Sequence, residues 1–381
     1  MIRKIGAFFL LLVLVGALFS ICAFAGDEEF AETPPDEFSD FLAAIPEDIA
    51  ELLPPGLFSQ NTEEIAEELQ NLSSFASLSA LLGALLSELL GNCLPVFCTV
   101  VGLLLLSAVF SAVRSSFQSG SVAKAFSFAA TLALLGALGA QCYAVVSSVV
   151  AYFERLNQLT AAVIPLSGAL WAMGGNVTAA SASSAGLSVY LTVLEEAVGN
   201  SILPFCGFCM AFSVMGALDG GLRFGTLIAS LKKHYTLFLA GLMTLLLAML
   251  GFQTLLAAKS DSLAMRGAKF AVGSMVPVVG GSVSELLRTV SAGVTYLRTT
   301  LGICAVLLIL FSLVPVLLRL WLWGLCWQVS AGVADLLGCD TEKKLLDEIA
   351  SLCGYLLAAA CICSSVLLLS CVLLVHCGTA I

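Results

Sequence analysis

Uninterrupted apolar runs, several of them about 20 residues or longer, constrain this chain more than any other feature. The runs near residues 235–257, 300–325 and 352–376 contain almost no charged side chains. A helix of about 20 apolar residues is long enough to cross the hydrocarbon layer of a membrane. Only 11% of the 381 residues are charged, whereas soluble domains carry about a quarter. The sequence therefore predicts an all-α, polytopic membrane protein with about 6–8 spans.

The N-terminus has the layout of a secretory signal peptide. Arg3 and Lys4 form a short basic region, residues 5–18 an apolar core, and Ala23-Phe24-Ala25 a small-x-small cleavage site. We predict a cleaved signal peptide over residues 1–25. The same residues would also support an uncleaved first span. In either case the chain after Ala25 is expected outside the cytoplasm.

The charge of the chain is distributed unevenly. Residues 27–68 contain 14 acidic side chains, and no Lys or Arg occurs between Lys4 and Arg114. The formal net charge of −10 therefore comes almost entirely from one segment, residues 26–78, which we expect to be exported. An acidic exported segment argues against binding nucleic acid or an anionic lipid surface.

The acidic segment contains two amphipathic patterns. Apolar residues at helical spacing predict one short helix (Phe38, Phe41, Leu42, Ile45) and one stripe on a second (Ile65, Leu69, Leu72). Asn61 and Glu64 suggest an N-cap and a capping pair for the second helix. We expect these helices to rest on the bilayer surface or on a partner. A solvated, partly disordered spacer is the alternative.

Basic residues set the expected orientation of the membrane body. Arg114 and Lys124 flank one short polar loop, and Arg223, Lys232 and Lys233 mark a second. Lys and Arg in short loops favour the cytoplasmic side, which agrees with an exported N-terminus. We assign residues 79–257 to the N-terminal half of the membrane domain and 299–381 to the C-terminal spans.

Residues 159–218 form short apolar segments interrupted by Pro and Gly. Such segments are typical of broken or re-entrant helices in transporters, but runs of Ala, Ser and Gly also favour close packing of intact helices. Both interpretations stay open. Glu195 and Glu196 lie within this region and are the candidates for an intramembrane acidic site.

A charged stretch over residues 258–298 stands out between the apolar runs. Lys259, Arg266 and Lys269 share a helical face, which is typical of a helix lying in the membrane interface. Three positive charges on the outer side oppose the positive-inside tendency, so a partner, the acidic segment or another topology must compensate. An ordinary solvated loop outside the cytoplasm is the alternative.

A turn and a second helix are predicted within the same stretch. Pro277 favours extended backbone before it, and Gly280-Gly281 permits a turn. Glu285 and Arg288 are spaced to pair on the helix that follows. We therefore interpret residues 258–298 as an amphipathic and hinge region that docks or gates.

Catalytic and metal-binding patterns are absent from the sequence. Cys206 and Cys209 have redox or metal spacing, but no nearby His or second Cys pair completes a zinc site. His234 and His376 are the only histidines, and no zinc-protease, phosphate-loop or nucleophile-elbow motif occurs. We predict no enzymatic activity, no metal and no cofactor.

The stretch "RGAKFAVGSMVPVVGGSVSELL" resembles the signature of the stage III sporulation protein AE family of endospore-forming bacteria. Arg266, Lys269, Phe270, Gly273 and the Pro277-Val-Val-Gly280 turn fill the positions of that signature, and Glu285 follows at a similar distance. The order of signal peptide, acidic exported segment and spans is also similar.

The resemblance implies a multi-pass component of the mother-cell membrane around the forespore, needed for endospore development. Its expected partners are the lipid bilayer, the other stage III A operon proteins, including a secretion-type ATPase and ring-forming subunits, and a forespore protein across the intermembrane space. The implied role is structural or that of a conduit in a sporulation channel or feeding apparatus. A stand-alone secondary transporter or permease is the alternative function.

Overall fold

The fold was analysed in a computed structural model of the chain. The structure describes residues 34–45, 47–50, 53–59, 61–72, 75–114, 120–173, 177–218, 224–245, 248–249, 251 and 280–376. Throughout these ranges the regular elements are helices, and no strand occurs among them. The predicted all-α class is therefore confirmed for this part of the chain. The predicted signal peptide lies outside the described residues.

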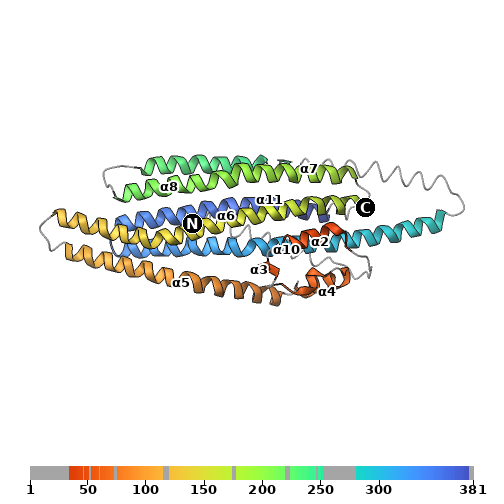
Figure 1. The fold of residues 1–381 in the computed structure, drawn as a ribbon, viewed down its shortest axis with the longest axis horizontal. Helices are drawn as coiled ribbons and strands as arrows, with labels where there is room; N and C mark the ends of the chain where they lie inside the picture. The colour runs from red at the N-terminus through yellow and green to blue at the C-terminus, as the bar shows by residue number, and fades with distance from the viewer. Residues whose placement is uncertain are drawn as a thin grey trace.

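Long antiparallel helices form the body of the molecule (Figure 1). They are α5 (Phe75–Arg114), α6 (Gly120–Met173), α10 (Gly280–Leu336) and α11 (Asp340–His376). The 57 residues of α10 extend for about 85 Å, far beyond the roughly 30 Å of a hydrocarbon layer. A bundle that crosses a membrane with a helix of this length protrudes from it. The predicted boundary between residues 298 and 299 lies inside α10.

Residues 177–218 are helical. They lie in the region for which the sequence allowed either a re-entrant segment or packed, intact helices. α7 (Val177–Val193) passes through a π-helical segment, η2 (Leu194–Gly199), into α8 (Asn200–Leu218). Both flanking residues of η2 keep right-handed helical dihedrals. Pro165 and Pro204 lie inside α6 and α8 without ending them. The described part of 159–218 is thus helical throughout, as the interpretation as packed helices expects, with η2 as a departure from α-helical bonding. A re-entrant path through the membrane stays a prediction.

The basic residues that were assigned to the cytoplasm gather at one end of the bundle. α5 and α8 end there, α10 ends there at Leu336, and α6 and α11 begin there (left in Figure 1). Arg114 is the last residue of α5, and Lys232 lies in a helix over residues 225–245 that follows α8 after a short gap. Lys343 lies in the first turn of α11. Three separate connections therefore place Lys or Arg at the same end.

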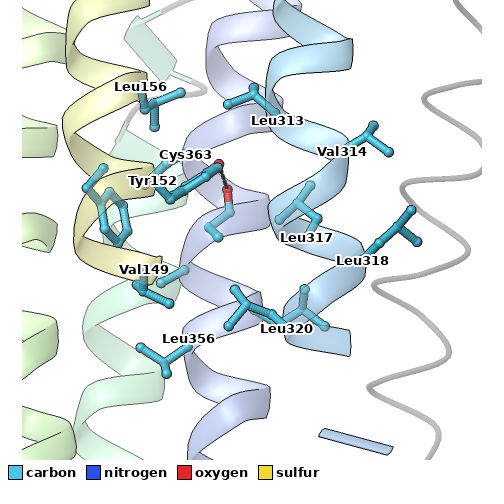
Figure 2. Packing of buried hydrophobic residues seen from close by; sticks show 14 of the residues in the cluster. Val149, Tyr152, Leu156, Leu313, Val314, Leu317, Leu318, Leu320, Leu356 and Cys363 are labelled. Atoms are coloured by element: carbon cyan, nitrogen blue, oxygen red, sulfur yellow. Dashed lines mark hydrogen bonds between the residues drawn. The ribbon is translucent and has the colours of Figure 1, made fainter. Parts of the chain in front are cut away.

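The central helix of the bundle is α10, which packs most extensively against α11 and also contacts α4, α5 and α6. Leu301, Leu308, Leu313 and Leu320 are all almost completely buried. Figure 2 shows Leu313 and Leu320 of α10 pointing toward α11 and α6. A helix that is apolar on every face is buried either among other elements or in lipid, and α10 is buried among the other helices.

The acidic segment folds onto this bundle. It contains α2 (Asp36–Ala43), α3 (Glu47–Ala50), η1 (Pro55–Phe58) and α4 (Thr62–Leu72). α2 packs against α6, and α4 packs against α10. Buried side chains line the packed faces, whereas most acidic side chains point outward. The described part is therefore no solvated spacer, and the surface on which it rests is the chain's own bundle. The buried residues are Phe38, Phe41, Ile45, Leu53, Leu57, Ile65 and Leu69.

Asn61 caps α4 as predicted, because its Oδ1 accepts a hydrogen bond from the Glu63 N–H at 3.1 Å. The hydrogen bond predicted between the Glu64 side chain and the backbone N–H of Asn61 is replaced. Ser59 Oγ, 3.1 Å away, accepts the backbone N–H of Asn61 instead. A side chain before the cap therefore performs the role that a capping box gives to a residue three positions after it.

Four helices in the described ranges are long and apolar enough to cross a membrane. They cover Leu86–Val109, Ala197–Gly216, Thr300–Leu336 and Asp340–Ser364. Large apolar side chains on the outside of the bundle, such as Leu94, Tyr143, Phe208 and Leu237, are more than half exposed. Exposed apolar groups of this size are what a lipid-facing surface requires.

Candidate functional site

Five of the eight residues predicted as a docking or gating element lie outside the described residues. These are Arg266, Lys269, Phe270, Gly273 and Pro277. Gly280, Glu285 and Arg288 lie in the first turns of α10, where the structure describes the backbone alone. The predicted helix is therefore present, but it begins at Gly280, so Gly280 and Gly281 are helical and the turn predicted at these two glycines is wrong. The pairing of Glu285 with Arg288 stays a prediction.

Glu195 and Glu196 lie in the π-helical segment η2. A π-helix is a rare departure from α-helical bonding and is often found at functional sites. Val198 in the same segment is buried, and Ser201 Oγ donates a hydrogen bond to the Ala197 carbonyl just after it. The predicted acidic pair thus coincides with the irregular segment of the α7–α8 stretch, where the structure gives the backbone of both glutamates.

A polar cluster that the sequence analysis did not predict links the helix over residues 225–245 to α11. Lys232, in the helix over 225–245, donates hydrogen bonds to Glu348 Oε2 and, over 3.0 Å, to Ser351 Oγ of α11. The Lys232 side chain is 13% exposed and that of Glu348 is 30% exposed. Glu348 lies about 12 Å along α11 from its first residue. The ion pair is therefore largely covered by helices rather than by solvent.

Aromatic and hydroxyl groups continue the cluster along the same helices. Thr236 Oγ1 donates to Tyr355 OH at 3.3 Å. Tyr235 stacks on Phe205 of α8, with ring centroids 3.9 Å apart, and its hydroxyl lies 3.4 Å from Ser201 Oγ. Successive turns of the helix over 225–245 are thus fastened to α8 and α11 by polar groups. We call Lys232, Glu348, Ser351, Thr236 and Tyr355 the polar cluster.

The geometry of the polar cluster fits a mechanical role. Lys232 is already neutralised by Glu348, so neither group is available as a free general base or acid. Leaving one charge without its partner in a low-dielectric site is strongly unfavourable. The ion pair therefore holds the helix over 225–245 and α11 in one register, and separating them requires a replacement for each charge.

Two tyrosines fasten α6 and α7 to α11 farther from the basic end. Tyr152 OH is hydrogen-bonded to Ser364 Oγ and donates to the Ala360 carbonyl at 3.0 Å. Tyr190 OH donates to the Cys363 carbonyl at 2.6 Å. Figure 2 shows the Tyr152 side chain reaching from α6 toward α11. Among the described residues, most polar contacts between helices therefore involve α11.

The sequence contained a signal for the polar cluster. Glu348, Ser351 and Tyr355 follow i, i+3, i+7 spacing, and Lys232 and Thr236 follow i, i+4 spacing, so each set occupies one helical face. Lys232 was interpreted as an orientation marker of a loop. Its place one helical turn before Thr236 pointed equally to a helix interior.

Within the described ranges, no three His, Cys, Asp or Glu side chains converge as metal ligands. Cys206 and Cys209 are both free thiols, and both are buried. They lie on consecutive turns of α8 and behave there as small apolar side chains. His234 is exposed, and its Nδ1 lies 2.8 Å from the Ser230 carbonyl on the same helix.

Comparison with known proteins identifies the family of the chain. The family model for stage III sporulation protein AE matches residues 58–380. Stage III sporulation protein AE of Bacillus subtilis (strain 168) is 25% identical over 312 residues, which make up 79% of this chain and 75% of the relative. No solved structure matches the chain. The matched range includes the signature residues and every long helix of the bundle, and the chain belongs to the stage III sporulation protein AE family.

Proposed function

We propose that the chain is a structural or conduit component of a sporulation channel or feeding apparatus between mother cell and forespore. The observation that carries the proposal is the family match over residues 58–380. In this proposal the protein lies in the mother-cell membrane around the forespore. It performs no catalysis there, and endospore development depends on it.

The proposed topology has six crossings after the signal peptide. The crossing segments are α5, α6, the α7–η2–α8 stretch, the segment that begins at residue 225, α10 and α11. Their alternating direction and the gathering of Lys and Arg at one end support this arrangement. The end with the basic residues then faces the mother-cell cytoplasm. The end with α2 and α4 faces the intermembrane space.

The length of the helices suggests how partners are reached. α6 is about 80 Å long by helical rise, so at least 40 Å of it lies beyond the hydrocarbon layer. On the outer side, the exposed acidic groups of α2 and α4 would meet the ring-forming subunits and the forespore protein. On the inner side, the ends of α5 and α6 would meet the secretion-type ATPase. The signature residues 266–288 would dock or gate on the outer side.

A genetic experiment tests the developmental role. Deleting the gene in its endospore-forming host should abolish a forespore-specific reporter after engulfment, and re-expression of the full chain should restore it. Single charge reversals, Glu285→Arg or Arg288→Glu, should reduce the reporter, and the double reversal should recover it. Normal reporter expression in the deletion strain contradicts the proposed function. Unchanged expression in both single variants contradicts only the gating pair.

Uptake measurements separate the proposed role from that of a stand-alone transporter or permease. Vesicles that contain the purified chain alone should accumulate labelled amino acids, sugars and ions no faster than empty vesicles, with or without a proton gradient. Saturable, gradient-driven uptake would establish the alternative, and Glu195 and Glu196 would then be the first candidates for the coupling site.

A further inference from the structure

The acidic segment bridges two of the long helices at a distance from the basic end of the bundle. We call its described residues, within 34–72, the strap. α2 of the strap packs on α6, and α4 packs on α10. Between them, Leu57 is fully buried, and its carbonyl accepts a weak hydrogen bond from the Cys304 thiol of α10 at 3.9 Å. The strap therefore joins α6 to α10 and covers Cys304.

The outward side of the strap is suited to water. Residues 34–72 contain ten acidic side chains and no Lys or Arg, and charged groups are costly in hydrocarbon. The level of Cys304 along α10 therefore lies beyond the lipid layer. From Cys304 to Leu336, α10 extends for about 48 Å, which leaves room for a layer of about 30 Å. The exposed acids are Asp36, Asp40, Glu47, Glu63, Glu64 and Glu67.

α10 remains apolar at the level of the strap. Every residue from Thr300 to Val314 is buried, and Leu301 and Leu308 have no exposed surface. Because lipid does not reach this level, protein must cover these side chains. The strap supplies part of that cover through Leu57 and Ile65, both fully buried. Without the strap, α10 would present an apolar surface to water, the kind of surface that binds another apolar surface.

The strap is fastened differently from the long helices. α6, α7 and the helix over residues 225–245 are each attached to α11 by a tyrosine hydroxyl or an ion pair. The strap packs through apolar side chains, to which the Cys304 thiol adds one weak hydrogen bond. Its helices are also short, with 8 residues in α2 and 11 in α4, and isolated helices of fewer than about 12 residues are marginal in water. Such an element opens at a lower free energy than the bundle.

We propose that the strap is a releasable cover of α10, which opens while the bundle stays folded. Opening exposes the face of α10 around Cys304 as a docking site for an amphipathic helix of a partner. The structure indicates this occupant, because α4 fills the face with such a helix: Ile65 and Leu69 are buried against the bundle, and Glu64 is exposed. The closed strap keeps the site occupied until a partner helix replaces it. Only the location of the site in the intermembrane space rests on the proposed function.

Thiol labelling measures the opening, because the strap and the bundle each cover a cysteine. Cys304 under the strap and Cys363 within the bundle are both 0% exposed. The full chain in mild detergent is treated with N-ethylmaleimide without denaturant, and peptide mass spectrometry follows both thiols. Cys304 should be modified at least about tenfold faster than Cys363, because local opening precedes unfolding of the bundle. Equal rates would mean that both thiols become accessible only together, and the releasable strap would be wrong.

Strap variants show whether the strap is what covers Cys304. Leu57→Asp places a charge between the strap and α10 and should raise the labelling rate of Cys304 about tenfold or more, while that of Cys363 stays unchanged. The milder Leu57→Ala should act in the same direction, and Cys363 reports for both variants whether the bundle is still folded. Glu63→Gln, at an exposed position of α4, is the control and should alter neither rate. Unchanged labelling of Cys304 in both Leu57 variants would overturn the proposal.

A peptide probe tests the docking face itself. A fluorescent peptide of residues 55–72 carries η1 and α4. It should bind the full-length Leu57→Asp chain about tenfold more tightly than the wild type, whose own strap competes for the face, and it should slow the labelling of Cys304. The same peptide with Ile65→Asp and Leu69→Asp should not bind. Equal binding to both chains, no binding to the opened chain, or equal binding by the substituted peptide would overturn the docking face. These measurements use the purified chain, so their failure leaves the proposed function standing.

Discussion

α10 and α5 are both apolar enough to cross a membrane, yet their surroundings are opposite. In the apolar part of α10, 83% of the residues are buried, whereas in that of α5 only 22% are. α10 is covered by α4, α5, α6 and α11, while α5 contacts its neighbours along one side. The same general composition therefore serves a central helix in one case and a peripheral helix in the other.

The difference shows what apolar composition specifies in a membrane protein. Lipid tails are about as apolar as leucine side chains, so an apolar residue can face either lipid or protein. The distribution of the remaining residues is more informative. The residues of α10 between Leu301 and Leu318 are apolar on nearly every face, whereas α5 carries the polar residues Glu88, Asn92 and Thr99 at exposed positions. Position around the helix, rather than average apolarity, separates the core from the periphery.

The largest expected effect comes from removing matched leucines from the two helices. Leu308→Ala on α10 removes a side chain with 0% exposure and should lower the free energy of unfolding by about 2–5 kcal/mol, because a cavity remains. Leu94→Ala on α5, where the leucine is 61% exposed, should change it by about 0.5 kcal/mol or less. Thermal unfolding of the detergent-solubilised chain measures both.

Equal losses from the two substitutions would contradict this contrast, because they would place Leu94 in a packed environment. Ile309→Val on α10, which removes one buried methylene, is an internal check. It should destabilise the chain by about 0.5–1.5 kcal/mol and so fall between the two leucine variants.

A smaller effect is expected at α11, whose burial of 56% is intermediate. Lys232→Met leaves the Glu348 carboxylate without its cation and should reduce stability by about 1–3 kcal/mol, less than for a fully buried pair because Glu348 is partly exposed. The double variant Lys232→Met with Glu348→Met should recover most of the loss. Unfolding temperatures of the two single variants and the double variant form the cycle. A double variant as unstable as the sum of the singles would show that the two residues act independently.

Much of the fold could be predicted from the sequence because the patterns were local. Helical spacing identified the faces of α2 and α4, and Lys and Arg near helix ends agreed with their common place in the bundle. What could not be predicted was where the amphipathic faces pack. The apolar faces that contain Phe38 and Ile65 show the same helical spacing whether they rest on lipid, on a partner or on the chain itself. Only the position of α6 and α10 determines which of these surfaces they pack against.

The continuity of the helices could also not be predicted from the sequence. Pro165 and Pro204 suggested breaks, because proline removes one backbone hydrogen bond and crowds the preceding turn. In a packed bundle, neighbouring helices hold such a helix together, and both prolines lie inside intact helices. The polar cluster was missed for a related reason. Lys232 and Glu348 are 116 residues apart, and no local pattern indicates which lysine meets which glutamate.

A hydrogen bond between core helices should matter less than a core side chain. Tyr152→Phe on α6 removes the hydroxyl that bonds to Ser364 and Ala360, and it should cost about 0.5–1.5 kcal/mol. Ser364 keeps its own bond to the Ala360 carbonyl, 2.7 Å away, so no buried donor is stranded. Tyr143→Phe on the same helix, where the tyrosine is 75% exposed, is the matched control and should not change the unfolding temperature. A loss at Tyr143 equal to that at Tyr152 would mean that the lipid-facing side of α6 is also packed.

The smallest effect on the unfolding temperature is expected from replacing a glycine by alanine, once on α5 and once on α10. Gly102→Ala on α5 adds a methyl group that meets no described atom within 4 Å, while at Gly324 on α10 it would lie 3.7 Å from Cys353 Cβ. Alanine favours a helix over glycine by up to about 1 kcal/mol, so Gly102→Ala should slightly raise the unfolding temperature of the monomer in detergent. Gly324→Ala places its methyl group in ordinary van der Waals contact with α11 and should also change the unfolding temperature only slightly. If Gly102→Ala lowers the stability of the monomer, the side of α5 that faces away from α10 is already covered within a single chain, and the contrast between the two helices disappears.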